Sequence, residues 1–254
     1  MSHPGRHPRS LKHEYELYVE REIEHYKESV PRSALLSIGD EAVRVLRGQA
    51  QFALTELVLW EEVDKIIMRR LRLPAYQTWR RRCLRALEQY RRPEHWGLNA
   101  ESALVRVVTR DAESNVLVAG DGIEPAALYL AAHGCDVITV ESAPDAVERV
   151  LNAAEAAGLT QRVRGCVTDI GHWTPDVPLN AVVCTPRAFA GLTPAERRTV
   201  IELLQSATAD GGVHLVETLV AGQEAISMTE LRDRYAGWEI TVEPQSFVAR
   251  KGAA

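Results

Sequence analysis

The sequence predicts an α/β protein, in which a mostly parallel sheet follows an all-α N-terminal part. After about residue 100, short apolar runs alternate with helical patterns, as expected for strands that crossover helices bury on both faces. Before that point the spacing is helical throughout. The charge also changes there: residues 1–100 carry 18 Lys and Arg against 14 Asp and Glu, whereas the remainder carries 12 against 21. We therefore expect a domain boundary near residue 100.

The N-terminal part has the spacing of long amphipathic helices. Residues 11–30 place apolar side chains three and four positions apart, and Pro31 ends this pattern. A turn is expected next, with Asp40 as the N-cap of a second helix that runs to about Leu73 unless Gly48 interrupts it. The apolar stripe of that helix would be buried either in its own domain or against a twin subunit, which would make a homodimer.

The segment 69–92 holds nine arginines and one acid, Glu88. Tyr76, Trp79 and Tyr90 are interleaved with the arginines, a pattern that could grip phosphates and stack on bases. It is equally typical of a solvated helix face that pairs with the acidic C-terminal part or with a protein partner. The net charge of −5 disfavours nucleic acid as the partner.

A strand–turn–helix–strand unit is expected between Asn115 and Ser142. An apolar run at 116–119 stops at Gly120, and a helix is expected over 125–133. Glycine at 120 and 122 lets the backbone turn sharply where a side chain would block a ligand. The N-terminus of the predicted helix then faces the place at the turn where a ligand would lie.

The second strand of this unit, at 137–140, ends in Glu141. A carboxylate at that strand end could accept hydrogen bonds from both hydroxyls of a ribose. The dinucleotide fingerprint would need glycine or alanine where Pro125 stands, which disfavours NAD. The unit is therefore typical of a nucleoside-binding half-fold.

The rest of the chain continues the alternation of helices and strands. Thr193 and Glu196 form a capping box that opens a late helix. The last two strands are separated by two residues only, so the final strand must be antiparallel. The other expected elements are a helix at 100–110, a helix at 146–158, and strands at 163–168, 181–184, 213–219, 238–243 and 246–250.

From about residue 99 to 251 the sequence resembles the class I S-adenosylmethionine-dependent methyltransferases. Within them it is similar to the small-molecule group related to tellurite-resistance and thiopurine methyltransferases. The resemblance rests on V-L-V-A-G-D-G at 116–122, A-L-Y-L-A-A-H-G-C-D-V-I-T-V-E at 127–141, C-V-T-D-I at 166–170, L-N-A-V-V-C at 179–184 and A-D-G-G-V-H-L-V-E at 209–217. It implies a Rossmann-like, mostly parallel seven-stranded sheet with an antiparallel last strand, and S-adenosyl-L-methionine as cofactor.

The resemblance also implies roles for individual residues. The glycine turn would approach the methionine part of the cofactor, Glu141 would hold the ribose, Asp169 would contact the adenine amino group, and Ile170 would donate to the ring from its backbone. The cofactor-binding residues expected in all are Gly120, Asp121, Gly122, Glu124, Glu141, Ser142, Asp169, Ile170 and Thr185.

Two positions depart from the family pattern. The acid of the first strand is replaced by Val118, and the third glycine of the turn is replaced by Glu124. The carboxylate of Glu124 would either contact the ammonium group of the cofactor or cap the helix N-terminus, where negative charge is favoured.

Methyl transfer from a sulfonium needs alignment more than acid–base catalysis. The candidate catalytic residues are His172, as a base for a poorly nucleophilic acceptor, and Arg187, which would clamp a carboxylate or phosphate of the acceptor or pair with a surface acid. No metal is expected, because the single E-x-x-H at Glu22 and His25 has no second copy and the four cysteines form no C-x-x-C pair.

The predicted function is therefore S-adenosylmethionine-dependent methylation of a small-molecule acceptor. The alternative is a catalytically silent methyltransferase-like module, whose basic helical domain contacts a protein or nucleic-acid partner. A nicotinamide-dependent oxidoreductase would need a hydride-accepting site that the sequence does not show.

We expect a disordered lead-in at 1–10, a helical lid or partner-binding domain at 11–98, and the cofactor-binding domain at 99–254. A cytoplasmic protein without a membrane partner is expected, because no apolar run approaches 18 residues, the N-terminus lacks a secretory signal, and the cysteines suit a reducing compartment.

Overall fold

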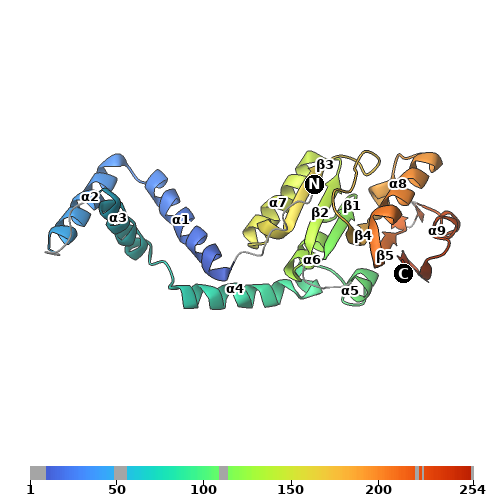
Figure 1. Ribbon diagram of the computed structural model, residues 1–254, viewed down its shortest axis with the longest axis horizontal. Helices are drawn as coiled ribbons and strands as arrows, with labels where there is room; N and C mark the ends of the chain where they lie inside the picture. Colours follow the sequence, from blue (N-terminus) through green and yellow to red (C-terminus); the bar gives the residue numbers. More distant parts are fainter. Residues whose placement is uncertain (1–9, 49–55, 109–113, 221–222, 225, 253–254) are drawn as a thin grey trace. The chain divides into compact units, whose positions relative to one another are not determined.

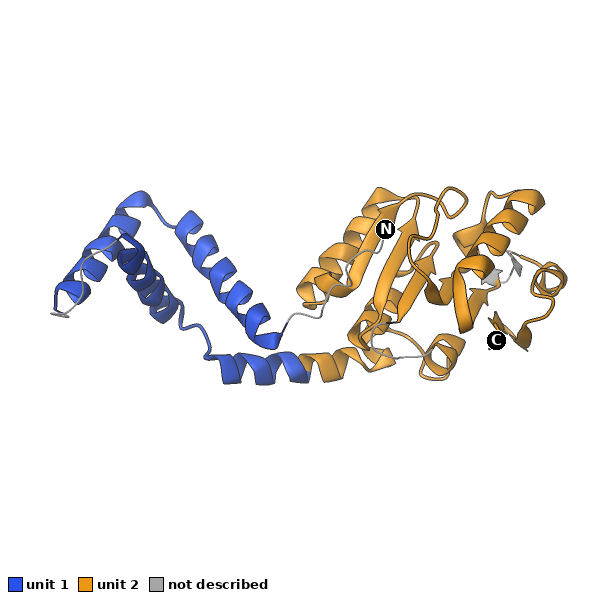
Figure 2. Cartoon of the chain, in the orientation of Figure 1, with its two compact units in different colours: residues 1–85 blue, residues 86–254 orange. Residues whose placement is uncertain are grey.

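The computed structural model of the chain describes residues 10–48, 56–108, 114–220, 223–224 and 226–252. The chain divides into two compact units, Met1–Arg85 and Ala86–Ala254 (Figure 2). The division falls inside helix α4 (Tyr76–Tyr90), ahead of the boundary predicted at residues 98–99. The proposed lid role of the N-terminal helices stays a prediction.

The first unit contains α1 (Leu11–Ser29), α2 (Arg32–Arg47), α3 (Glu56–Leu71) and the first part of α4. The first of these confirms the helix predicted over 11–30. Apolar side chains from the first three helices form a small core, whose buried members are Ile23, Ile38, Ala42, Val63, Ile66 and Ile67.

The turn predicted before Asp40 is wrong, because Asp40 lies inside α2 rather than at its N-cap. Ile38 and Ala42, four residues apart, are fully buried against the neighbouring helices. This packing outweighs the low helix propensity of the glycine between them. Gly48 is the C-cap of α2, so the interruption that the sequence left open at Gly48 is present, and α3 is a separate helix that ends at Leu71.

The aromatic residues in the first half of the arginine-rich segment 69–92 take part in helix packing. The rings of Tyr76 and Trp79 each lie 5.5 Å from the ring of Tyr15, and Trp79 stacks on Tyr18 at 6.0 Å. These contacts join α4 to α1 within the first unit. Stacking of the same rings on nucleic-acid bases would have to break them.

The second unit is built on a seven-stranded sheet with the order β3-β2-β1-β4-β5-β9-β8 (Figure 1). Strands β1 to β5 are parallel, and β9 is antiparallel to both of its neighbours, as the short last connection predicted. The strands are β1 (Asn115–Ala119), β2 (Asp136–Glu141), β3 (Val163–Val167), β4 (Leu179–Cys184), β5 (Thr208–Glu217), β8 (Glu239–Glu243) and β9 (Ser246–Arg250).

The predicted apolar runs are strands because both faces of the sheet are covered. Alternate residues of β1 belong to opposite cores: Val116 and Val118 face one core, and Leu117 and Ala119 face the other. Figure 1 shows α6 and α7 on one side of the sheet and α8 on the other. The helices of this unit are α5 (Ala103–Val107), α6 (Glu124–Ala132), α7 (Pro144–Ala156), α8 (Pro194–Ala207) and α9 (Met228–Arg234).

Short elements complete the second unit, and two sequence details can be compared with it. The capping box of Thr193 and Glu196 is present at the start of α8, as predicted. Strand β5 begins at Thr208 rather than Val213, because the glycines between them fit in an irregularity of the β4–β5 register. The short elements are η1 (Pro93–Trp96), η2 (Thr160–Arg162), η3 (Pro186–Phe189), β6 (Leu219–Val220) and β7 (Gln223–Glu224).

Among the described helices, none combines the length and the apolar composition that crossing a bilayer requires.

The turn between β1 and α6 depends on glycine. Gly120 and Gly122 have φ angles of +98° and +70°, a region that side chains disfavour. A Cβ atom on Gly120 would lie 2.3 Å from Thr185 Oγ1 and 2.7 Å from the backbone nitrogen of Ala188, whereas one on Gly122 would meet nothing within 4 Å. Gly120 thus lets the turn pack directly against the chain that leaves β4.

A buried polar chain fixes β5 to the end of α8 and to α9. The imidazole of His214 is fully buried, and its Nε2 and Nδ1 lie 2.7 Å from Thr208 Oγ1 and from the Tyr235 hydroxyl, respectively. Thr208 donates its own proton to the carbonyl of Leu204. Nε2 of His214 must therefore carry the hydrogen, and Nδ1 accepts from Tyr235. Burial, and secondarily the charge of Lys251, lowers the pKa of His214 to about 3.

We expect His214 to stay neutral in the folded protein from pH 7 down to about pH 4. An unfolded histidine binds its proton near pH 6.5. His214 therefore lowers the free energy of unfolding by about 1.4 kcal/mol per pH unit as the pH falls from about 6.5 towards 3. Nitrogen–proton NMR correlations of the imidazole, recorded across a pH titration, measure this directly. A midpoint near 6.5 for His214 in the folded protein would contradict the arrangement.

We also expect Gly120→Ala to destabilise the second unit by roughly 2–5 kcal/mol, from backbone strain plus overpacking. Gly122→Ala is the matched control, because it adds a similar backbone strain in open space and should cost only about 1–2 kcal/mol. Hydrogen–deuterium exchange at the amides of β1 and β4 reports the free energy of opening for each variant. Equal losses in the two variants would show that the close approach at Gly120 is not the constraint.

Candidate functional site

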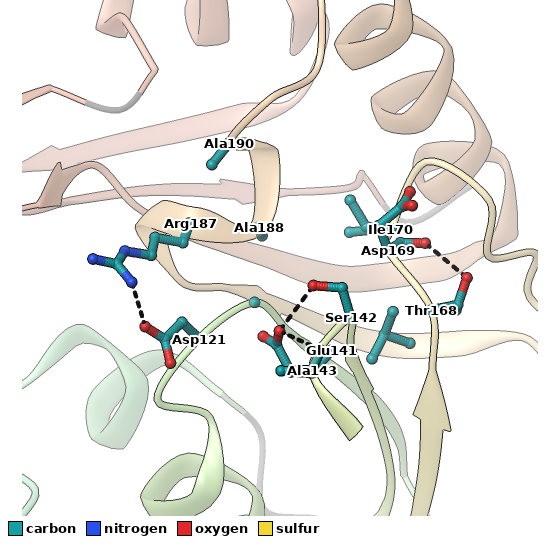
Figure 3. Close-up of a pocket in the computed structure, with 12 residues that line it drawn as sticks. Asp121, Glu141, Ser142, Ala143, Thr168, Asp169, Ile170, Arg187, Ala188 and Ala190 are labelled. Atoms are coloured by element: carbon teal, nitrogen blue, oxygen red, sulfur yellow. Dashed lines mark hydrogen bonds and ion pairs between the residues drawn. The ribbon is translucent and has the colours of Figure 1, made fainter. Parts of the chain in front are cut away.

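A cleft of about 380 Å³ lies at the carboxyl ends of the central parallel strands (Figure 3). This edge is where ligands bind in open α/β sheets, at the point where the strand order reverses. The order reverses between β1 and β4 here, since β2 and β3 lie on one side of β1 and β5 lies beyond β4. The cleft is lined by Gly120, Asp121, Val140, Glu141, Ser142, Ala143, Thr168, Asp169, Ile170, Arg187, Ala188 and Ala190.

The first wall of the cleft consists of the glycine turn and the segment after β4. Asp121 follows Gly120 in the turn, and Arg187 lies in η3, which begins directly after β4. Arg187 Nη1 lies 2.9 Å from Asp121 Oδ2, so an ion pair joins the two segments. Figure 3 shows the two side chains extended toward each other at one end of the cleft.

The middle of the cleft is formed by Glu141, the last residue of β2. Its Oε1 accepts hydrogen bonds from the Ser142 hydroxyl and from the backbone N–H of Ala143, both at 3.1 Å. These two contacts fix the carboxylate. Within the part of the chain that is described, Oε2 accepts no hydrogen bond, so it can accept from ligand hydroxyls.

The other wall contains Asp169, which follows β3. Its Oδ1 accepts from the backbone N–H of Gly171, and both carboxylate oxygens lie 2.9 Å from Nδ1 of His172. The hydrogen bond from His172 is the main cause that lowers the pKa of the Asp169 carboxyl. Asp169 is therefore ionised at neutral pH and can accept from an amino group. Ile170 beside it is buried.

Four residues predicted from the sequence do not line the cleft. Gly122 and Glu124 lie further along the turn, and Glu124 is the first residue of α6. His172 is 82% exposed, next to Asp169. Thr185 is buried beneath Gly120, where its hydroxyl has no partner among the described residues. The functions predicted for these side chains remain predictions.

Five lining residues were not predicted from the sequence, and most of them form the apolar part of the walls. Four of them are next to a predicted residue in the chain, whereas Ala190 lies three positions after Arg187. Adjacency to the strand ends was the signal that could have identified them. They are Val140, Ala143, Thr168, Ala188 and Ala190.

The charged residues of the lining are three carboxylates and one guanidinium. Such a cleft complements a ligand that carries more positive than negative charge and that offers hydroxyl or amino donors. Among the described residues, no group of three or more His, Cys, Asp or Glu side chains is placed to hold a metal ion. The arrangement can bind and orient a polar ligand at the switch point of the sheet.

No protein-family model matches the sequence, and no curated protein matches it either. Solved structures do match the fold. TehB from Haemophilus influenzae is 18% identical, with a TM-score of 0.51 over 62% of this chain and 65% of that one. The match therefore spans slightly less than two thirds of TehB.

Two further structures have TM-scores of 0.48 and are each 15% identical. One is the N-methyltransferase NodS from Bradyrhizobium japonicum WM9, matched over 68% of this chain and 96% of that one. The other is magnesium protoporphyrin IX methyltransferase (ChlM) from Synechocystis PCC 6803, matched over 59% and 74%. The fold assignment rests on TehB and on the observed strand order. The second unit of the chain has the Rossmann-like fold of the class I S-adenosylmethionine-dependent methyltransferases.

Proposed function

We propose that the protein is an S-adenosylmethionine-dependent methyltransferase that acts on a small-molecule acceptor. One observation carries the proposal: three separate sequence motifs meet in one cleft at the switch point of the sheet. These are the glycine turn at Gly120, the carboxylate of Glu141 at the end of β2, and the carboxylate of Asp169 after β3. The resemblance assigns the same three positions to the methionine part, the ribose and the adenine of the cofactor.

The residues present fit this cofactor. Because Gly120 has no side chain, the turn packs directly against Thr185 and Ala188, and Gly120 itself lines the cleft. Glu141 would hold the ribose through its available Oε2, and Asp169 would accept from the adenine amino group. When bound, the cofactor supplies a methyl group that a sulfonium leaving group has already activated.

The contribution of the chain to such a reaction is alignment. Fixing the donor near an acceptor supplies much of the rate of a bimolecular transfer. His172 is outside the cleft lining and is held by Asp169, so the proposal does not require it to move a proton. The small-molecule acceptor is supported by the resemblance to the small-molecule methyltransferases. All four cysteines are free, which supports a reducing, cytoplasmic setting.

Titration calorimetry with S-adenosylmethionine tests the proposal. We expect saturable binding to the wild-type chain and a Kd that rises about 10- to 100-fold in Glu141→Ala, because a hydrogen bond to a charged group contributes about 1.5–3 kcal/mol. Glu148→Ala is the matched control: Glu148 is an exposed acid on α7, outside the cleft, and its loss should leave the Kd unchanged.

The same titration decides between the two functions predicted from the sequence. An absence of heat at millimolar cofactor would reject the methyltransferase and favour the silent binding module. Binding that Glu141→Ala leaves unchanged would show that the ligand lies outside this cleft.

A further inference from the structure

We propose that Asp121 and Arg187 exchange their mutual ion pair for the amino-acid tail of the cofactor, with Asp121 binding the ammonium group and Arg187 binding the carboxylate. The inference rests on the proposed function and assigns Arg187 to the cofactor rather than to the acceptor. It identifies two residues that position the methionine end.

The location of the pair supports this assignment. Asp121 and Arg187 both line the cleft, at the end formed by the glycine turn and η3. Glu141 lies in the middle, and Asp169 lies at the opposite wall (Figure 3). If Asp169 and Glu141 hold the adenine and the ribose, the tail of the same ligand points toward the turn that carries Asp121.

The charges of the residues that line the cleft also support the assignment of Asp121 and Arg187 to the amino-acid tail. Arg187 is the only cationic side chain among the residues that line the described cleft. Glu141 and Asp169 already accept hydrogen bonds from neighbouring donors, whereas the partner that the structure gives Asp121 is Arg187 itself. The tail carries one ammonium and one carboxylate on the same carbon. Its two charges match two opposite charges whose atoms lie 2.9 Å apart.

The existing ion pair is easily opened. The side chains of Arg187 and Asp121 are 62% and 53% exposed. Exposed ion pairs contribute little to stability, so separating the two residues costs little. In the complex each residue would regain an opposite charge inside a cleft from which the ligand has displaced water, and Arg187 could bind the carboxylate with two parallel hydrogen bonds.

The ion pair also places an acid in the cleft, which the two departures from the family pattern, Val118 and Glu124, do not. The family position at Val118 is fully buried and carries no charge, and Glu124 is not among the residues that line the cleft. Asp121 is the acid that the glycine turn contributes to the lining. The acid placed to bind the ammonium group is therefore Asp121.

The experiment compares two ligands that differ in the tail. S-adenosylhomocysteine has the adenosine part and the zwitterionic tail, whereas 5′-methylthioadenosine has the adenosine part and no amino-acid group. Calorimetric Kd values are measured for both with the wild-type chain, Arg187→Gln, Asp121→Asn and the control Arg198→Gln. Arg198 is an exposed arginine on α8, outside the cleft. The thermal unfolding midpoint of each variant confirms that it is folded.

We expect Arg187→Gln and Asp121→Asn each to weaken S-adenosylhomocysteine about 10-fold or more, because each removes a charge-assisted contact. The Kd of 5′-methylthioadenosine should change less than about twofold in every variant, and Arg198→Gln should leave both ligands unchanged.

Equal losses for the two ligands, or no loss for either, would overturn the inference while leaving the proposed function intact. Unchanged cofactor affinity in Arg187→Gln would return Arg187 to the acceptor. If neither ligand binds the wild-type chain, the proposed function falls and the inference falls with it.

Discussion

The backbone of Gly120 lies so close to Thr185 and Ala188 that no side chain fits between them. This contact joins the turn after β1 to the segment after β4, on the two sides of the point where the strand order reverses. Because the two segments meet there, Asp121 and Arg187 reach the same end of the cleft. The arrangement at this end of the site therefore depends on the missing Cβ atom of Gly120, in the turn after β1.

The parallel sheet supplies the second part of the arrangement. Strands β1 to β4 end at one edge, so side chains that follow each strand converge although they are far apart in the sequence. Glu141 and Asp169 meet the glycine turn for this reason. Short local contacts then fix each carboxylate: Ser142 and Ala143 hold Glu141, and the loop after β3 holds Asp169.

Much of this architecture could be predicted from the sequence. Strands buried on both faces appear as continuous apolar runs, so β1, β2 and β4 could be identified before any pairing was known. The two residues between β8 and β9 required an antiparallel end to the sheet. Gly120 and Glu141 could be predicted from the strand–turn–helix–strand pattern itself, and Asp169 followed from the resemblance.

Other features depend on tertiary contacts that the sequence does not reveal. Gly39 and Asp40 suggested a turn, but burial of Ile38 and Ala42 keeps the helix continuous. The pairing of Asp121 with Arg187 joins residues 66 positions apart and depends on how η3 folds back from β4. His172 was predicted as a base for a poorly nucleophilic acceptor; the structure shows its hydrogen bond to Asp169, three positions away, and its catalytic role stays a prediction.

If the protein is an S-adenosylmethionine-dependent methyltransferase, the cleft at the ends of β1, β2 and β3 holds an adenosyl group. A crystal structure of the chain grown with S-adenosylhomocysteine measures this most directly. We expect density for the nucleoside in the cleft, with the ribose hydroxyls within hydrogen-bond distance of Glu141 and the adenine amino group near Asp169. Density elsewhere on the molecule, or a cleft closed by its own side chains with Glu141 turned away from the ligand, would contradict it.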